Sequence, residues 1–393
     1  MKNIIIIGGG ASGFMAAILL ARKGQKVTVL EKNDAPLKKL LVTGNGRCNL
    51  TNTADPADNI FSRNREKALD IISRFDCAKI REFFLDLGVK TKSRDGWIYP
   101  ENDSAALVRR FLQLEAEACR VKVKTNETVV KVLRTEDGFE VQTNTWKYPA
   151  DCVILSCGSR AFLDDAKEFA SWNIAEDMGL FVYPALAALT GVRGDENWYG
   201  KWAGVRVNAC VFLLTDGRIA GMEEGELQLT DYGISGIPVF QLSIQAAAAL
   251  AEGRDVRFVM DFCPDMEESR VEAFLSESMK KHSAYTLFRA LSGLLPEKLA
   301  EVIAAHAENP AEAAGLVKAF EMKAKSTCGF ERAQAAAGGV SLDCLDENLQ
   351  AVNVPGFYVT GEACDVTGKC GGFNLTWAFA SAAAVAKSIA NIK

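Results

Sequence analysis

Residues 4–13 read Ile-Ile-Ile-Ile-Gly-Gly-Gly-Ala-Ser-Gly, and this stretch decides the fold. The four isoleucines are typical of a buried strand, and the glycines that follow form the pattern G-x-G-x-x-G. Residues 14–23 predict a helix that Gly24 ends, and residues 27–30 predict a second strand that leads into Glu31. A strand, a glycine turn, a helix, a second strand and an acidic residue, in this order, predict a dinucleotide-binding βαβ unit.

The three glycines of the motif have separate physical roles. Gly8 permits a tight turn, Gly10 lets the backbone approach a pyrophosphate, and Gly13 lets the helix pack close to the strand. The N-terminus of the helix supplies free N–H groups and a partial positive charge for the phosphates. Glu31 is placed to accept hydrogen bonds from the adenosine ribose, and its charge would repel the 2′-phosphate of NADP. The predicted nucleotide is therefore FAD or NAD.

Two further polar stretches, at residues 40–52 and 356–374, favour FAD. Residues 40–52 are rich in residues that bend the chain and donate hydrogen bonds, so we expect them to lie near the dinucleotide. The alternative is a surface turn capped by an asparagine. Residues 356–360 predict a strand, which is followed by a polar turn and by a helix opened by Gly371 and Gly372. A reduced flavin is negatively charged, and free N–H groups at this second helix N-terminus would stabilise that charge. A nicotinamide ring has no such need.

With these motifs, the chain resembles the aminoacetone oxidase and BaiN/YhiN-like family of bacterial FAD proteins. The matching stretches span almost the whole chain and comprise residues 8–13, 31, 39–52, 229–243, 337–340 and 361–380. The resemblance implies an α/β fold with a Rossmann-type FAD domain in two segments, interrupted by a β-rich domain that carries a small helical subdomain. The expected domains are 1–185 with 330–393 for FAD, 186–262 for the β-rich domain, and 263–329 for the helical subdomain.

The family pattern also implies which residues bind FAD. It puts the pyrophosphate on Gly10 and Ser12, the ribose on Glu31, and the adenine beside Val129. The full expected set is Gly8, Gly10, Ala11, Ser12, Gly13, Glu31, Lys32, Lys39, Thr43, Gly44, Asn45, Gly46, Arg47, Cys48, Asn49, Val129, Gly158, Gly361, Glu362, Asp365, Gly371, Gly372, Phe373 and Asn374. The chain departs from the family pattern at residues 159–163, where a G-G-x-S-Y-P type of turn is usual, and this departure concerns substrate specificity.

The resemblance implies an FAD-dependent oxidoreductase that transfers hydride through flavin N5, and it leaves the substrate open. One expectation is oxidation of an aminoacetone-type amine with O₂ as acceptor. The alternative is NAD(P)H-dependent reduction of an enone or steroid-like substrate of the bile-acid type, and another class is a flavin-binding redox sensor or RNA-modification factor. NAD(P)H would be a transient reductant, since residues 191–337 hold no second glycine motif. Arg47, Tyr99 and Tyr232 are the candidate polar groups near the substrate.

Composition narrows the partners and the location. The 393 residues carry a net charge of −5 without a long block of either sign, which disfavours nucleic acid and favours a small-molecule substrate. The 11 cysteines do not show the spacings of metal ligands, so we expect reduced thiols and no metal site. Because we recognise no secretory leader in the sequence, we expect no membrane span and a cytoplasmic location. Cys48 stands alone in its region, which disfavours a redox disulfide. Cys364 and Cys370 either pack in the core, pair or bind metal.

Outside the motifs, the sequence predicts the larger elements. Residues 67–87 predict one long helix and residues 105–119 another, while residues 121–143 predict short strands. Five aromatic residues lie outside a clear apolar periodicity and either wall a substrate pocket or fill the core: Trp97, Tyr99, Trp198, Tyr199 and Trp202.

Overall fold

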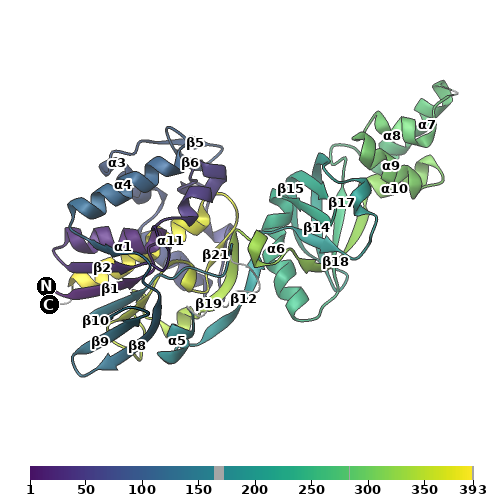
Figure 1. Ribbon diagram of the computed structural model, residues 1–393. Helices are drawn as coiled ribbons and strands as arrows, with labels where there is room; N and C mark the ends of the chain where they lie inside the picture. The colour runs from purple at the N-terminus through teal and green to yellow at the C-terminus, as the bar shows by residue number, and fades with distance from the viewer. Residues whose placement is uncertain (163–171, 283, 392–393) are drawn as a thin grey trace. The chain divides into compact units, whose positions relative to one another are not determined.

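A computed structural model describes residues 1–162, 172–282 and 284–391 of the chain (Figure 1). The described residues form two compact units. The first unit takes its described residues from Met1–Arg160, Ala166–Ala185 and Ala335–Lys393, and the second from Ala161–Asp165 and Leu186–Gln334. Each unit has its own core of buried apolar side chains.

The first unit is organised around a five-stranded parallel sheet in the order β20-β11-β1-β2-β7. Its strands are β1 (Asn3–Ile7), β2 (Lys26–Leu30), β7 (Lys122–Lys124), β11 (Cys152–Leu155) and β20 (Phe357–Val359). The first four strands come from the N-terminal part of the chain, whereas β20 comes from the C-terminal part. This order of parallel strands confirms the predicted α/β Rossmann-type fold, in which a nucleotide binds at the carboxyl ends of the strands.

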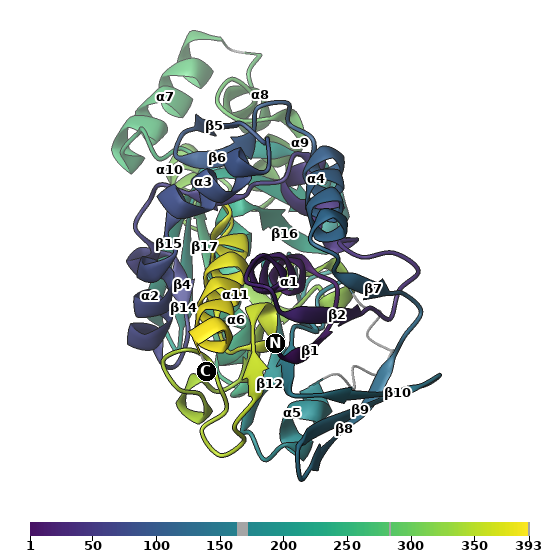
Figure 2. The ribbon, with the colours of Figure 1, turned by 90° about the vertical axis from the view of Figure 1, so that its left-hand side faces the viewer.

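Helices and a small antiparallel sheet cover the two faces of the parallel sheet. Figures 1 and 2 show α1 (Ala11–Arg22) and α11 (Phe373–Asn391) side by side on one face of β1 and β2. The opposite face carries the meander of β8 (Val129–Thr135), β9 (Gly138–Thr143) and β10 (Lys147–Ala150). Both helices are rich in buried alanine, which allows them to pack closely.

The prediction of one long helix over residues 67–87 is wrong. The chain forms two helices there, α2 (Arg65–Arg74) and α3 (Cys77–Asp86). Asp76 interrupts the helix, because its carboxylate accepts a hydrogen bond from the Lys79 N–H at 3.0 Å and so caps α3. The remaining elements of the first unit are α4 (Ala105–Ala118), α5 (Asn173–Asp177), β3 (Thr51–Asn52), β4 (Ile60–Phe61), β5 (Thr91–Arg94), β6 (Trp97–Pro100), β12 (Val182–Ala188), which runs into the second unit, β19 (Ala335–Val340) and β21 (Thr367–Gly368).

The second unit is a closed six-stranded barrel with helices, in the strand order β13-β16-β15-β14-β17-β18. The strands are β13 (Val192–Gly194), β14 (Arg206–Thr215), β15 (Arg218–Thr230), β16 (Gly233–Gly236), β17 (Val256–Asp261) and β18 (Phe320–Thr327). The helices are α6 (Ile237–Ala251), α7 (Glu268–Lys281), α8 (Leu287–Ser292), α9 (Glu297–Ala305) and α10 (Pro310–Lys318). Tyr199 and Trp202 are buried in its core, at 2% and 0% exposure, so these two aromatic side chains do not wall an open pocket.

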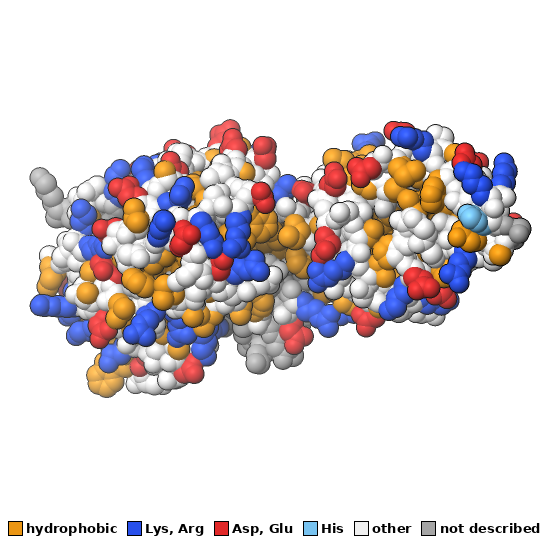
Figure 3. All heavy atoms as spheres, turned by 90° about the horizontal axis from the view of Figure 1, so that it is seen from above, with side chains coloured by type: hydrophobic (Ala, Val, Ile, Leu, Met, Phe, Trp, Pro, Cys, Tyr) orange, Lys and Arg blue, Asp and Glu red, His pale blue; other side chains and the backbone are white. Residues whose placement is uncertain are grey.

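Two global features of the described chain bear on its partners. None of the described helices is both long enough and apolar enough to cross a membrane. On the face drawn in Figure 3, basic and acidic side chains are interspersed. This matches the absence of long single-sign blocks in the sequence.

Candidate functional site

The glycine turn between β1 and α1 is tightly packed on two sides and open on the third. A side chain at Gly8, whose φ is +107°, would place its Cβ 2.3 Å from the Ser156 carbonyl oxygen. A Cβ at Gly13 would lie 2.1 Å from the Gly8 carbonyl oxygen, whereas a Cβ at Gly10 would meet no atom within 4 Å. Gly8 and Gly13 therefore hold the turn together, and Gly10 faces free space.

The first turn of α1 is suited to an anion. Gly10 is the N-cap, no side chain caps the helix, and the first turn contains no acidic residue. The first N–H groups of an α-helix have no partner within the helix, so they remain available to a ligand. This arrangement fits the predicted pyrophosphate position at Gly10 and Ser12.

Glu31 joins the end of β2 to the glycine turn. Its carboxylate is buried and accepts hydrogen bonds from the Gly9 N–H at 2.7 Å and from the Asn33 N–H at 2.9 Å. The Glu31 carbonyl also accepts a hydrogen bond from the Glu127 N–H at 2.9 Å, two residues before Val129. The structure thus brings the predicted ribose and adenine residues into one region, with the exposed Lys32 next to it in the chain.

The predicted loop after β2 contains the 3₁₀ segment η1 (Lys39–Gly46), whose second half is a kinked turn with non-helical backbone at Thr43, Gly44 and Asn45. Gly44, Asn45, Gly46 and Cys48 all have positive φ, between 55° and 83°. The turn is closed by a hydrogen bond from the Cys48 N–H to the Thr43 carbonyl at 3.0 Å. Left-handed conformations cost free energy for residues other than glycine, so a run of them is typical of a site shaped for a ligand.

Asn49 carries the clearest sign of a missing partner. Its side chain is 5% exposed, and neither its amide nitrogen nor its oxygen has a hydrogen-bond partner in the described part of the chain. Gly372, at the start of α11, lies against it, because a Cβ at Gly372 would stand 2.9 Å from Asn49 Oδ1 and 2.7 Å from the Thr51 carbonyl. A buried polar group without a partner is costly. The Asn49 carboxamide therefore fits the edge of a bound heterocycle that offers both donors and acceptors, as the flavin pyrimidine ring does.

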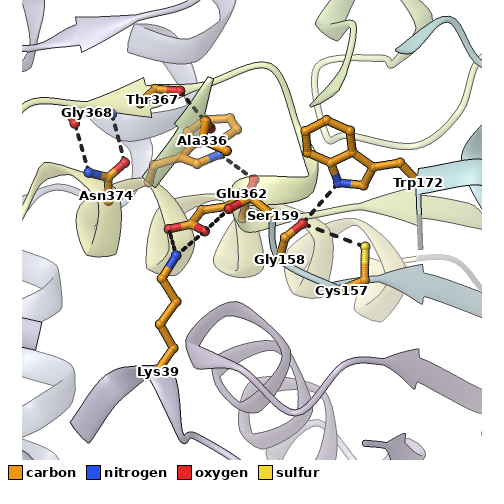
Figure 4. Close-up of polar contacts among 12 residues, drawn as sticks. Lys39, Cys157, Gly158, Ser159, Trp172, Ala336, Glu362, Thr367, Gly368 and Asn374 are labelled. Atoms are coloured by element: carbon orange, nitrogen blue, oxygen red, sulfur yellow. Dashed lines mark hydrogen bonds and ion pairs between the residues drawn. The ribbon is translucent and has the colours of Figure 1, made fainter. Parts of the chain in front are cut away.

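The other predicted residues at the start of α11 pack or hold the backbone. Figure 4 shows the Asn374 side chain bonded twice to Gly368: its oxygen accepts from the Gly368 N–H at 2.9 Å, and its nitrogen donates to the Gly368 carbonyl at 2.8 Å. Phe373 is buried, and Gly371 lies against Asn52. Asn374 thus fixes the turn before α11, while the N–H groups of that helix remain the predicted flavin contacts.

Glu362 connects three segments that are distant in sequence. Its carboxylate accepts hydrogen bonds from Lys39 Nζ at 2.9 and 2.6 Å and from Ser159 Oγ at 2.8 Å (Figure 4). The preceding Gly361 accepts from Trp377 Nε1 at 2.9 Å, and Gly158 accepts from Trp172 Nε1 at 3.1 Å. Ser159 belongs to the segment that departs from the family pattern, and Leu163 of that segment lies outside the described residues.

Arg63 is a site residue that the sequence did not reveal. Its guanidinium donates to Asp365 Oδ1 at 3.0 Å and lies 3.9 Å from the centre of the Tyr183 ring. Asp365 is buried, so this ion pair fixes its carboxylate next to the Gly361 turn. The two residues are 302 positions apart, and no local pattern marks Arg63.

Of the three predicted substrate-side residues, two lie beside the kinked turn. A Cβ at Gly44 would be 3.3 Å from Tyr99 Cε1, so the Tyr99 ring packs on that turn. Burial raises the pKa of Tyr99, and the positive charges of Arg47 and Arg94 oppose that rise. Arg47 is exposed. Tyr232 belongs to the second unit, whereas Arg47 and Tyr99 belong to the first.

Burial suppresses thiolate formation at three cysteines close to the predicted flavin site. None of the 11 cysteines, all of which the structure describes, forms a disulfide, and burial raises the pKa of both Cys48 and Cys157 to about 12. Burial also raises the pKa of Cys364, and the structure does not pair Cys364 with Cys370. No group of three or more His, Cys, Asp or Glu side chains in the described residues is placed to hold a metal ion.

Sequence and structure comparisons show what the chain is similar to. The profile of the HI0933-like protein Rossmann domain family matches residues 2–388. The chain is 37% identical over 397 residues to 3-dehydro-bile acid delta(4,6)-reductase of Clostridium scindens, covering 97% of each chain. It is 26% identical over 405 residues to Ribosomal RNA dihydrouridine synthase of Escherichia coli, covering 98% of each. The crystal structure of 3-ketosteroid delta1-dehydrogenase from Sterolibacterium denitrificans shares the fold, with a TM-score of 0.50, 12% identity and 100% coverage of both chains.

Proposed function

The chain belongs to the HI0933-like Rossmann-domain family and is an FAD-dependent oxidoreductase, and from this premise we propose that it reduces a carbon–carbon double bond conjugated to a carbonyl group. The family expected from the motifs is confirmed. The observation that carries the proposal is the buried, unpartnered Asn49 carboxamide beside Gly372, because it provides a place for a flavin edge next to Tyr99.

The names of two relatives support this reaction class. A delta(4,6)-reductase acting on a 3-dehydro-bile acid saturates double bonds that are conjugated to a ketone. A dihydrouridine synthase saturates the double bond of uracil that is conjugated to a ring carbonyl. Saturation of such a bond needs a hydride at the electron-poor end of the conjugated system and a proton at the neighbouring carbon. The higher identity to the bile-acid enzyme and the net charge of −5 favour a small molecule over RNA as substrate.

Bound FAD, once reduced, supplies the hydride. Gly10 and the first turn of α1 would hold its pyrophosphate, while Asn49 and the first turn of α11 would hold the flavin. The Tyr99 hydroxyl is the candidate proton donor, because its ring packs on the turn at Gly44 and a phenol is protonated at neutral pH. The positive charges of Arg47 and Arg94 would stabilise the phenolate that forms when Tyr99 gives up its proton.

A reductase needs a source of two electrons for each turnover. We assign this role to NAD(P)H, which would bind transiently because residues 191–337 contain no second glycine motif. Amine oxidation of the aminoacetone type, with O₂ as acceptor, is the second candidate. It is supported by the motif resemblance at residues 39–52 and 361–380.

The decisive experiment uses anaerobic, FAD-loaded protein whose flavin has been reduced chemically. Addition of testosterone or cyclohexenone should restore the visible band of oxidised flavin, while the saturated controls dihydrotestosterone and cyclohexanone should not. Uridine and a ribosomal RNA fragment test the RNA alternative. Bleaching of the oxidised flavin by aminoacetone, with peroxide formed in air and no response to any enone, would replace the proposal by the oxidase.

A further inference from the structure

A second polar cluster lies in the second unit, at one end of the barrel. Three segments meet there: residues 191–194, 231–233 and 328–332. The Gly194 N–H donates to the Tyr232 carbonyl at 2.9 Å, and the Cys328 N–H donates to the Gly191 carbonyl at 2.9 Å. These backbone bonds hold together residues that are between 38 and 137 positions apart in the sequence.

Tyr232 is fixed at the centre of this cluster. A Cβ at Gly191 would lie 2.9 Å from the Tyr232 hydroxyl oxygen and 3.2 Å from Cys328 Sγ, so only a glycine lets the ring approach the backbone so closely. The hydroxyl end of the ring is thereby held by Gly191, and the backbone end by the bond from Gly194. Because the Tyr232 ring is already fixed at both ends, its side chain loses little conformational entropy when a ligand binds.

Two guanidinium groups converge on the Tyr232 ring. The Arg193 guanidinium lies 5.2 Å from the ring centre, and that of Arg332 lies 5.3 Å from it. Both arginines are exposed, and no described carboxylate lies within ion-pair distance of either. Asp231 and Glu331 neighbour the cluster in sequence without pairing with it. Two positive charges thus share one aromatic ring without a negative partner.

From this convergence we propose that Arg193, Tyr232 and Arg332 form a binding site for an oxyanion, namely a carboxylate or a phosphate group of a small ligand. Guanidinium groups present N–H donors in a planar fork that matches both anions, and the ring orients the two forks by cation–π contact. The Tyr232 hydroxyl is hydrogen-bonded to Cys328, so the two arginines supply the donors of this site. All three residues belong to the second unit.

Two sources could supply such an anion, and direct titration distinguishes them. Calorimetric titration of the FAD-loaded protein would use inorganic phosphate, NADPH and NADH for the phosphate source, and octanoate for the carboxylate source. Tighter binding of NADPH than of NADH, together with binding of phosphate, identifies the phosphate of a nucleotide reductant. Binding of octanoate in preference to phosphate identifies the carboxylate of an organic substrate.

Substitutions decide whether the cluster is responsible. The variant with both Arg193→Gln and Arg332→Gln should bind the preferred probe at least tenfold more weakly, with each single variant in between, and Arg218→Gln should bind it like the wild type. Arg218 is an exposed arginine of the same barrel with no ring contact among the described residues. Should the double variant fail to fold, the two single variants decide. Equal affinity in all variants, or no binding of any probe by the wild type, would overturn the site.

Discussion

The Asn49 carboxamide packs against Gly372 at the start of α11, where a Cβ at Gly372 would stand only 2.9 Å from Asn49 Oδ1. These residues are 323 positions apart, and together they form a buried polar corner in which the amide has no described partner. Substitutions at Asn49 and Gly372 can therefore test the cofactor site without a known substrate.

The Asn49→Leu variant should separate folding from flavin binding. Because the amide has no protein partner, a side chain of similar size without polar atoms should leave the stability of the flavin-free protein unchanged or higher. Flavin affinity should fall about tenfold or more, because the hydrogen bonds between the uncharged Asn49 carboxamide and the flavin are lost. Thermal unfolding of the flavin-free protein and a flavin titration measure the two effects.

Asn52→Leu is the matched control for that experiment. Asn52 donates to the Gly371 carbonyl at 2.8 Å and accepts from the Ala54 N–H at 2.9 Å. Its replacement should lower the stability of the flavin-free protein by about 1–3 kcal/mol, because both backbone partners lose their bonds. If Asn49→Leu destabilises the flavin-free protein as much as Asn52→Leu does, then the Asn49 amide has a structural role.

Gly372→Ala should prevent flavin retention. Gly372 has a φ of +96°, and its Cβ would lie 2.7 Å from the Thr51 carbonyl, so the start of α11 must shift. Gly179→Ala is the control, since Gly179 also has a positive φ but would meet no atom within 4 Å. The Gly179→Ala substitution should lower the free energy of unfolding by only about 1–2 kcal/mol, through backbone strain. This variant should keep its full flavin content after purification. Equal flavin content in both variants would contradict the prediction.

Gly10→Val should yield a folded protein without flavin. A Cβ at Gly10 meets nothing within 4 Å, so the side chain fits the flavin-free protein but occupies the space predicted for the pyrophosphate. Gly13→Val should instead fail to fold, because its Cβ would lie 2.1 Å from the Gly8 carbonyl. Circular dichroism and flavin absorbance distinguish the two outcomes, and a Gly10→Val protein with full flavin content would refute the phosphate assignment.

Tyr99→Phe should lower the rate of enone reduction by about 100-fold while flavin content stays normal. Burial raises the pKa of Tyr99 above its ordinary value, so a proton donor at this position loses its proton only at alkaline pH. Arg47→Gln removes a charge that lowers this pKa, so the alkaline limb of the pH–rate profile should move to higher pH. A movement to lower pH would exclude Tyr99 as the donor.

Cys48→Ser should retain both flavin and turnover. Burial raises the pKa of Cys48 to about 12, so almost no thiolate forms at neutral pH. Iodoacetamide should therefore leave Cys48 unlabelled in the folded protein and label it after unfolding in guanidinium chloride, as mass spectrometry of the peptide can show. Loss of turnover with flavin retained would indicate a thiol mechanism.

The sequence was informative where the chemistry is local. The run from Ile4 to Glu31 specifies a strand, a turn, a helix and a strand through neighbouring residues, and the structure forms these elements as β1, α1 and β2. The second helix N-terminus at Gly371 and Gly372 could also be predicted, because two glycines before an apolar helical run form a local signal. The break at Asp76 was missed, since a single capping aspartate was outweighed by the helical periodicity on either side.

By itself, the sequence determined the Rossmann-type fold, the family and the class of cofactor, because backbone conformation and hydrophobic periodicity are set within a few residues. Only the tertiary structure decided which polar groups are left without partners and which are already bonded. Asn49 and Asn374 both stood in flavin motifs, yet one amide is unpartnered while the other holds Gly368. The physical reason is that hydrogen bonds form between groups that are close in space, so the availability of a side chain to a ligand depends on neighbours that are often distant in sequence.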